Sequence, residues 1–245
     1  MGPAFLLDWT RMSSTTTYEA VPVIGARDET PSLRAIRVAL GPLAATHAVP
    51  GQVVKVRAPA GEAYFALASA PAPDGMADLL VKRGGRIADE VVAASVPGAL
   101  LEVSAPFGKG FPVAAAEGRD VLLFAAGSGI APVRALLEHV MAHRDRFGRA
   151  TLFYGQRRGA DFAYRAEHVD WERHGVRVVL CPSSADEAWP GVRGRVQEVA
   201  RVLDLGGSDP AGTEAFVCGM TAMVNDVKGT LKDAGIPPER VHLNF

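Results

Sequence analysis

A glycine-rich segment with the sequence FAAGSGIAP (124–132) carries the residue types that can hold a phosphate group. It lies between a continuous apolar run and a segment whose apolar residues recur at helical spacing. Gly127 and Gly129 let the backbone approach a phosphate closely, and Pro132 suits the first turn of a helix. Because the amides and the dipole at a helix N-terminus attract anions, the segment predicts a pyrophosphate site. A plain strand-to-helix turn is the alternative, since glycine and proline are common in such turns.

This segment departs from the usual dinucleotide fingerprint in two ways. Pro132 stands where the fingerprint has its third glycine, and Arg157 follows the next predicted strand, where an acidic residue is usual. Binding of a 2′-phosphate is favoured by Arg157, Arg193 and Arg195, whereas the two acids of PSSADE (182–187) would repel one. The sequence therefore leaves open whether a bound dinucleotide carries the 2′-phosphate.

Two cysteines stand at the ends of two other predicted strands. Cys218 lies in FVCGM (216–220), directly before a predicted helix, and Cys181 opens CPSS (181–184). In an alternating strand–helix sheet these strand ends face the same crevice as the glycine-rich segment. A cysteine in a β-run is more often a small core residue, so the pattern alone favours a core role for both. Two cysteines cannot supply the four ligands of an iron–sulfur cluster, and the six histidines show no metal-ligand spacing, so no metal site is expected.

The composition is that of an ordinary globular protein. The 245 residues are 48% hydrophobic and 22% charged, and the formal net charge is −1. Without a basic excess, nucleic-acid binding through general electrostatics is not expected. No apolar run reaches the roughly 18 to 20 residues of a membrane span, and the N-terminal residues lack the features of a signal peptide, with Met12 an alternative start. The predicted location is the cytoplasm.

The period of the apolar residues changes near the middle of the chain. Residues 1–17 form a flexible lead-in, and 18–112 contain short β-like runs separated by glycine and proline, which predicts a small antiparallel β-barrel. From 113 to 245 strands and helices alternate, which predicts an α/β domain with a doubly wound parallel sheet covered on both faces. In the first half, strands are predicted at 33–40, 51–59, 63–69, 77–83 and 99–106, and a helix at 87–95. In the second half, strands are predicted at 120–127, 149–156, 176–183, 214–219 and 241–245, and helices at 132–144, 162–175, 194–203 and 222–235.

A β-barrel, then AAGSGIAP, then VCGM before the last helix resembles the ferredoxin–NADP reductase superfamily of FAD- and NAD(P)H-dependent oxidoreductases. The likeness runs from about Tyr18 to Phe245 and is closest to stand-alone proteins without an iron–sulfur domain. It implies that the barrel is of the flavin-binding type and that the second half binds NADPH or NADH. The residues that it places around the pyrophosphate of NAD(P)H are Gly127, Ser128, Gly129, Ile130, Ala131 and Pro132.

The resemblance also assigns the other strand ends of the second half. It implies that Cys218 and Gly219, followed by Met220, lie beside the nicotinamide, where hydride passes to the flavin. The implied role of Cys218 is positioning, not nucleophilic attack. The residues that fall where related enzymes contact the adenosine ribose or its 2′-phosphate are Arg157, Ser183 and Ser184.

The flavin half matches the family less well. Aligned on the family's Arg-x-Tyr-Ser motif, Arg becomes Ala63, Tyr becomes Phe65 and Ser becomes Ala66. The missing Arg normally pairs with the FAD pyrophosphate, but Phe65 can still stack on the flavin because stacking needs only the ring. A second flavin element usually has a Gly and, three residues later, a hydroxyl residue, where this chain has Ala88. The residues implied to contact the flavin are Phe65, Ala66, Leu67, Ser69, Gly84 and Gly85.

Four further residues are candidates for replacing or completing the flavin contacts. Lys82, Arg83 and Arg86 are candidates to replace the lost cation, although each is also typical of a solvated strand end or loop. Phe245 is implied to cover the flavin face opposite the barrel, or alternatively is buried in the sheet.

Three functions are compatible with these residues. The first is a reductase in which FAD takes hydride from NAD(P)H and passes electrons to an external acceptor, either a redox protein or a small molecule. The second is a relative without enzyme activity that acts as a nucleotide- or partner-binding module. The third lies between them, a flavin reductase that uses free flavin as a dissociable substrate. The acceptor and the oligomeric state are not legible in the sequence.

Overall fold

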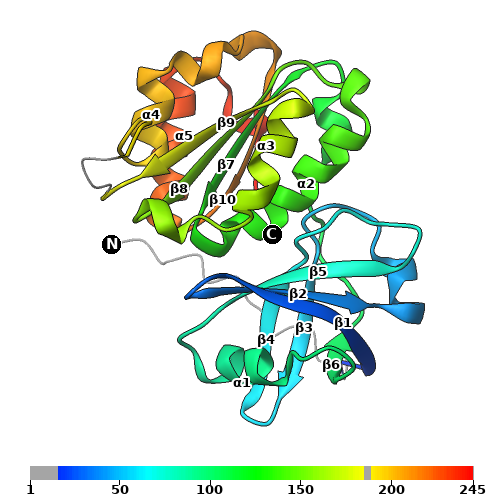
Figure 1. The fold of residues 1–245 in the computed structure, drawn as a ribbon. Coiled ribbons are helices and arrows are strands. Elements are labelled where there is room, and N and C mark those ends of the chain that lie inside the picture. Colours follow the sequence, from blue (N-terminus) through cyan, green and yellow to red (C-terminus); the bar gives the residue numbers. More distant parts are fainter. Residues whose placement is uncertain (1–15, 185–188, 245) are drawn as a thin grey trace, which may run out of the picture.

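The first half of the chain forms a six-stranded antiparallel sheet in the computed structural model, which describes residues 16–184 and 189–244 (Figure 1). Its strands are β1 (Tyr18–Thr30), β2 (Leu33–Ala39), β3 (Val53–Ala58), β4 (Gly61–Ala66), β5 (Met76–Lys82) and β6 (Leu100–Ser104), in the spatial order β4-β3-β6-β1-β2-β5. An antiparallel bridge between Leu67 and Leu79 joins the chain after β4 to β5, so the two edge strands meet. The predicted small antiparallel barrel is confirmed.

The barrel encloses its own apolar core. Residues of β2 such as Ile36 and Val38 are fully buried, while Arg37 between them faces outward, as expected for alternation along a strand. Helix α1 (Arg86–Ala94) covers one end of the barrel and contributes Val91 and Val92 to this core. The barrel core is thus complete without any residue of the second half.

The second half is a parallel five-stranded sheet covered by helices on both faces. The strands are β7 (Asp120–Ala126), β8 (Ala150–Gln156), β9 (Val176–Pro182), β10 (Thr213–Cys218) and β11 (Val241–His242), in the order β11-β10-β7-β8-β9. The helices are α2 (Ile130–Ala142), α3 (Arg165–Arg173), α4 (Val196–Val202) and α5 (Thr221–Asp233). Helices α2 and α3 pack into the core on one face, and α4 and α5 pack into the core on the other. The predicted doubly wound sheet is confirmed.

The central position of β7 in this sheet explains why its sequence is apolar. All residues from Val121 to Ala125 are fully buried, because β7 has helices on both faces and a strand on each side. Such strands read as continuous apolar runs. Short 3₁₀ turns complete the chain at Gly41–Thr46, Val113–Ala116, Gly127–Gly129, Arg144–Arg146, Gly159–Asp161, Asp204–Gly207, Pro210–Gly212 and Pro238–Arg240.

The strand order creates a switch point between β7 and β10. From β7 the chain moves outward through β8 to β9, and then returns to the other side of β7 to form β10 and β11. Ligands of doubly wound sheets bind in the crevice beyond the carboxyl ends of strands at such a point. In this protein the carboxyl edge faces the barrel, so the crevice opens between the two halves (Figure 1).

One strand was not predicted, and one predicted helix begins later and ends earlier than expected. The first barrel strand, β1, runs over Tyr18–Thr30 and was not among the predicted strands. The helix predicted at 162–175 is shorter, Arg165–Arg173, because Tyr164 before it adopts a left-handed conformation with φ 58°. The boundary placed between residues 112 and 113 stays a prediction; it falls in the connection between β6 and β7. No helix within 16–184 and 189–244 is long and apolar enough to cross a membrane.

Candidate functional site

A cavity of about 900 Å³ lies between the barrel and the carboxyl edge of the parallel sheet. The barrel contributes the end of β4 and part of β5 to its wall: Tyr64, Phe65, Ala66, Leu80 and Lys82. The sheet contributes the chain that follows β7, β8, β9 and β10, together with the first turns of α2, α4 and α5. Residues as far apart in the sequence as Tyr64 and Asp226 therefore line the same cavity.

The glycine-rich turn after β7 forms the floor of this cavity. Gly127 has φ 60°, a conformation that glycine adopts without strain, and a Cβ atom there would meet open space. Helix α2 starts at Ile130 and continues the 3₁₀ turn Gly127–Gly129, and the Ile130 amide already donates to the Gly127 carbonyl. No described side chain caps this N-terminus, so an anion there would meet the amides of the turn itself. The lining residues from this turn are Gly127, Ser128, Gly129, Ala131 and Pro132. The residues fit a pyrophosphate, whereas Ile130 is fully buried in the core and does not line the cavity.

Gly129 serves a different purpose from Gly127. A Cβ atom at Gly129 would overlap the carbonyl oxygen of Cys218 and lie 2.8 Å from its carbonyl carbon and 3.1 Å from the amide of Gly219. The turn after β7 therefore presses directly against the turn after β10. This contact brings the phosphate-binding segment and the cysteine–glycine pair together at the switch point.

Both thiols border the cavity and both are un-ionised at neutral pH. Burial raises the pKa of Cys218 to about 12, and burial likewise raises the pKa of Cys181 to about 12. A thiol is a poor nucleophile until it loses its proton. A protonated thiol is compatible with the predicted positioning role of Cys218, which stays a prediction. Cys181 combines two roles, because it belongs to the core under α4 and also lines the cavity.

The far end of the cavity is built by the ends of β8 and β9. The Ser183 amide donates to the Gln156 carbonyl at 2.9 Å, and the Ser184 amide donates to the Arg157 carbonyl at 2.8 Å. These bonds hold both serines against the strand that carries Arg157, and all four residues line the cavity. Arg195, before α4, lines it too, and neither arginine side chain forms an ion pair within the described chain.

The end of β4 provides the aromatic wall on the barrel side. Phe65 pairs with the buried Val54 and packs against the barrel core, whereas Tyr64 points to the other side of the strand and is 49% exposed. Tyr64 makes an edge contact with Phe107 at a ring-centroid distance of 6.1 Å. Tyr64, Phe65 and Ala66 all line the cavity. The segment that aligns with the flavin motif therefore supplies two aromatic residues instead of one.

Of the three candidate cations, Lys82 alone lines the cavity. Arg83 forms an ion pair with Asp28 across the barrel surface, and Arg86 is paired with Glu90 on α1 at 3.7 Å. The side chain of Lys82, the last residue of β5, has no ion pair or hydrogen bond within 16–184 and 189–244. Two aromatic rings and one available cation fit the ring system and the phosphates of a flavin nucleotide.

Several residues implied by the resemblance lie elsewhere. Leu67 is buried in the barrel core, and the Ser69 hydroxyl accepts a hydrogen bond from the Asp78 amide at 2.9 Å. Gly84 and Gly85 precede α1 but do not line the cavity, and the Gly84 amide is bound by the Asp89 carboxylate at 2.9 Å. Phe245 lies outside the described residues.

Sequence reasoning missed cavity residues that carry no motif. Tyr64 was passed over in favour of its neighbour, although two adjacent aromatic residues at a strand end were a visible signal. Gln197 and Asp226 line the cavity from α4 and α5 and are joined by a hydrogen bond of 3.0 Å. Nothing in the sequence around either residue indicates this. Among the described residues no group of three or more His, Cys, Asp or Glu side chains is placed to hold a metal ion.

Several known proteins are similar to this chain in sequence, and several solved structures are similar to it in fold. Residues 123–229 match the family model described as an oxidoreductase NAD-binding domain. The chain is 32% identical over 201 residues to sulfhydrogenase 1 subunit gamma of Pyrococcus furiosus, covering 80% of this chain and 67% of that one.

Two solved structures share the fold of both halves. A ferredoxin reductase in carbazole 1,9a-dioxygenase superposes with a TM-score of 0.79 at 22% identity, over 95% of this chain and 70% of the other. A ferredoxin NADP⁺ reductase from Neisseria gonorrhoeae with bound FAD and NADP superposes with a TM-score of 0.77 at 18% identity, over 94% of this chain and 100% of the other.

Proposed function

This chain belongs to the ferredoxin–NADP reductase superfamily, and from that premise we propose that it is a flavin-dependent NAD(P)H oxidoreductase. The observation that carries the proposal is the shared cavity. The phosphate-binding turn after β7 and the aromatic end of β4 open into the same space, so a nicotinamide and a flavin held by them would lie in contact. When bound, the flavin accepts a hydride from NAD(P)H and releases the two electrons to an acceptor.

The protein's part is to bind and orient the two groups. The amides of the turn Gly127–Gly129, which leads into α2, and the open side of Gly127 receive the pyrophosphate of the nucleotide. Cys218 and Gly219, pressed against Gly129, form the wall beside the nicotinamide. Because the thiol of Cys218 stays protonated, it fills space there and takes no part in covalent chemistry.

On the barrel side, shape and stacking replace the family's usual ion pair. Phe65 and Tyr64 offer ring surface to the flavin, and Lys82 is the cation placed to meet its phosphates. Ala63, where the family has an arginine, pairs with the buried Val56 and brings no charge to the site. This loss supports a second candidate, a flavin reductase that binds flavin weakly and releases it after reduction.

The electron acceptor lies outside these 245 residues, because two cysteines cannot ligate an iron–sulfur cluster. We infer that it is a separate redox protein. The relatives' names support this, since a sulfhydrogenase subunit gamma and a reductase component of an alkene monooxygenase system are each one part of a multi-component assembly.

The test is a visible absorbance spectrum of the purified protein, followed by titration with FAD and anaerobic addition of NADPH or NADH. Bound-flavin bands that bleach on reduction support the reductase. Weak FAD binding with rapid NAD(P)H oxidation supports the flavin reductase instead. Protein that neither binds added FAD nor oxidises NAD(P)H would refute both and leave a binding module without enzyme activity.

The role of Lys82 is tested by Lys82→Gln, with Arg86→Gln as its matched control. Losing one charge-assisted phosphate contact, worth about 1.4 kcal/mol, raises the FAD dissociation constant about tenfold. Arg86 is exposed and paired with Glu90, so its replacement leaves FAD affinity unchanged. Equal affinity in wild type and Lys82→Gln would remove Lys82 from the flavin site.

A further inference from the structure

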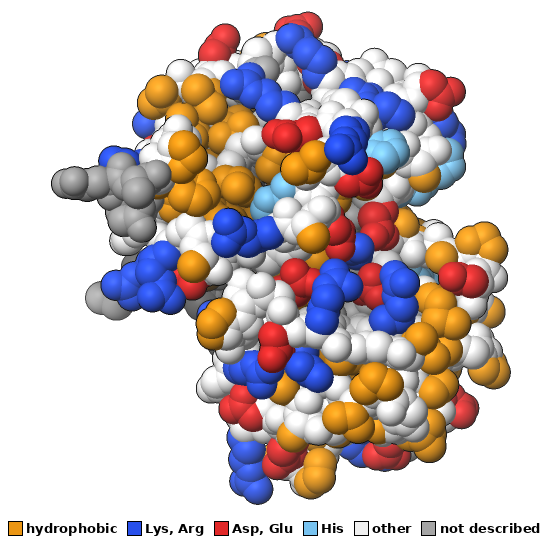
Figure 2. Space-filling view, viewed as in Figure 1, with side chains coloured by type: hydrophobic (Ala, Val, Ile, Leu, Met, Phe, Trp, Pro, Cys, Tyr) orange, Lys and Arg blue, Asp and Glu red, His pale blue; other side chains and the backbone are white. Residues whose placement is uncertain are grey.

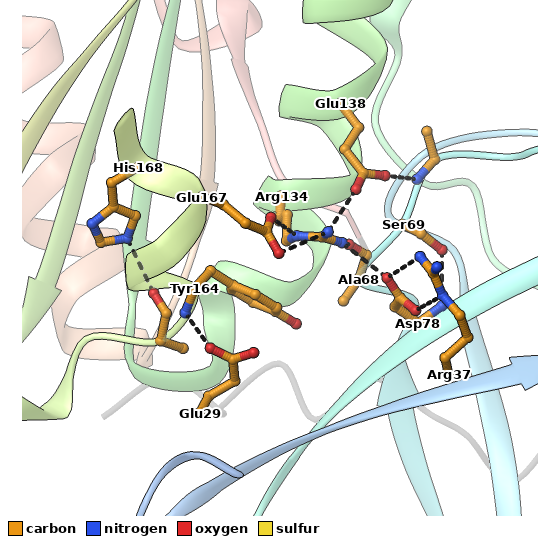
Figure 3. Close-up of polar contacts among 12 residues, drawn as sticks. Glu29, Arg37, Ala68, Ser69, Asp78, Arg134, Glu138, Tyr164, Glu167 and His168 are labelled. Atoms are coloured by element: carbon orange, nitrogen blue, oxygen red, sulfur yellow. Dashed lines mark hydrogen bonds and ion pairs between the residues drawn. The ribbon is translucent and has the colours of Figure 1, made fainter. Parts of the chain in front are cut away.

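Arg134, a buried residue of α2, lies at the junction of the two halves (Figure 3). It is not among the residues that line the cofactor cavity. All five of its N–H groups have an acceptor. Nε and one Nη2 proton reach the two oxygens of Glu167, at 2.7 and 3.2 Å. The other Nη2 proton faces Glu138 at 2.8 Å, and Nη1 donates to the Ala68 carbonyl at 2.6 Å and to Asp78 at 3.3 Å. No other side chain type can satisfy this set of acceptors.

The acceptors divide between the two halves. Glu138 and Glu167 belong to α2 and α3, whereas Ala68 and Asp78 belong to the barrel. Glu138 extends the connection, because its second oxygen accepts a hydrogen bond from the Ala70 amide at 2.8 Å. Arg134 is thus the centre of a cluster that joins the second half to the barrel, and acidic and basic side chains are mixed along the same junction on the molecular surface (Figure 2).

A second contact crosses the junction beside the first. The Tyr164 amide donates to Glu29 of β1 at 2.7 Å, and the Tyr164 ring lies under the Arg134 guanidinium, with 4.6 Å from Cζ to the ring centroid (Figure 3). Tyr164 has the left-handed conformation that non-glycine residues rarely adopt. A residue held in such a conformation requires support from its surroundings, which here come from the barrel and from Arg134.

The position of the cluster relates it to the cofactor cavity. Arg134 lies on the second turn of α2, whose N-terminus is the phosphate-binding turn. Ala68 and Ala70 directly continue β4, whose last residues form the aromatic wall. Helix α2 thus connects the phosphate-binding turn to the Arg134 cluster, and the short segment after β4 connects the aromatic wall to the same cluster.

We propose that Arg134 is a positioning residue that sets the spacing between the phosphate-binding turn of α2 and the flavin-binding end of β4. This inference rests on the proposed function for its kinetic consequence, but its structural part does not. Hydride transfer depends steeply on the separation of donor and acceptor, and a displacement of about 1 Å can lower the rate about 100-fold. Binding of each cofactor by its own half depends on it much less.

The experiment compares Arg134→Lys and Arg134→Met with Arg37→Gln. Arg37 belongs to the same charge network, but it pairs with Asp78 on the outer surface of the barrel and both residues belong to the barrel, so its loss does not cut the junction. Lysine retains the charge but has three donors in place of five, so it cannot hold both halves. Arg134→Met removes the shared cation from three partly buried carboxylates. Asp78 keeps Arg37 and Glu167 keeps Arg27, but Glu138 loses its arginine partner. If this variant does not fold, Arg134→Lys carries the test.

Two kinds of measurement are made. The first is hydrogen exchange in ligand-free protein over peptides that contain Ala70 and Tyr164, whose amides donate across the junction. Exchange at both rises at least tenfold in Arg134→Lys and stays within threefold of wild type in Arg37→Gln. The second is rapid-mixing measurement of flavin reduction. In Arg134→Lys the limiting rate falls about 100-fold, while the dissociation constants of FAD and nucleotide change less than threefold.

Unchanged exchange at Ala70 and Tyr164 in Arg134→Lys would overturn the proposed positioning role, whatever the kinetics. A limiting rate equal to that of wild type, measured alongside raised exchange, would also overturn it. If the wild-type protein binds no flavin, the proposed function fails by itself, and the exchange measurement still decides whether Arg134 couples the two halves.

Discussion

Replacing Gly129 by alanine tests the contact between the two turns at the centre of the site. The new Cβ atom would lie 2.8 Å from the carbonyl carbon of Cys218 and 3.1 Å from the amide nitrogen of Gly219. Carbon atoms pack at about 3.5–4.0 Å, so one turn must move by about 1 Å. The obstacle is backbone on both sides, and no flexible side chain can yield instead.

Two magnitudes follow from this displacement. Overpacking of this kind costs about 2 kcal/mol, which corresponds to a fall of about 4–8 °C in Tm for a chain of this size. Separating the phosphate-binding turn from Cys218 by about 1 Å lowers the limiting rate of flavin reduction about 100-fold. Differential scanning calorimetry and rapid-mixing kinetics measure the two effects separately.

Gly229→Ala is the matched control, because the same substitution should raise the stability of the protein at that position. Gly229 lies on the exposed face of α5 with open space around its Cβ position. Alanine in a helix interior is favoured over glycine by about 0.5–1 kcal/mol, so Tm rises by about 1–4 °C. If Gly129→Ala melts and reduces flavin like wild type, the two turns are not in contact and the argument for the site's centre is refuted.

Three further predictions test the barrel, the nucleotide site and the flavin wall. Burial lowers the pKa of His47 to about 4, below its ordinary value of 6.5, so protonation favours unfolding. The free energy of unfolding therefore falls by up to about 3 kcal/mol as the pH drops from about 6.5 to 4. In His47→Leu the melting temperature depends less on pH over this range, and a pH dependence equal to that of wild type would contradict the prediction. Replacing Arg157 and Arg195 by alanine raises KM for NADPH at least about tenfold and leaves KM for NADH unchanged if they bind a 2′-phosphate; equal changes would assign both arginines to a contact common to the two nucleotides. Phe65→Ala raises the FAD dissociation constant about tenfold through loss of stacking, and unchanged retention, measured by flavin fluorescence, would transfer that role to Tyr64.

Most of the fold was predictable because its signals are local. The run from Val121 to Ala125 is continuous and apolar, and a glycine-rich turn follows it directly. The first barrel strand was missed for an equally local reason. Its sequence contains Pro22 and Gly25, and its pairing with β2 is irregular between Val23 and Gly25, so strict alternation is lost. β1 still forms because it pairs with β2 on one side and with β6 on the other.

The residues of the cavity likewise fall into those with a local sequence signal and those without one. Gly127 and Cys218 were found because each lies in a short motif at a strand end, where the chemistry depends on neighbours in sequence. Lys82 was one of three candidate cations, and the structure was needed to show that it alone of the three lines the cavity. Tyr64 was missed because the sequence does not show which side of a strand faces the second half. Arg134 gave no signal, because a charged residue within a helix ordinarily points to solvent. Its burial results from tertiary contacts with the barrel.

The raised pKa values of the two cavity thiols have a chemical consequence for a protein that handles reducing equivalents. At pH 7 a thiol with a pKa of about 12 is ionised in about one molecule in 100,000. Peroxide and alkylating agents attack the thiolate, so both cysteines are poor targets for these oxidants and reagents. A reduced flavin can react with oxygen and generate peroxide, so a flavin bound in this cavity as proposed would expose both thiols to that oxidant. The burial that makes the thiols useful as packing would then also protect them from oxidation.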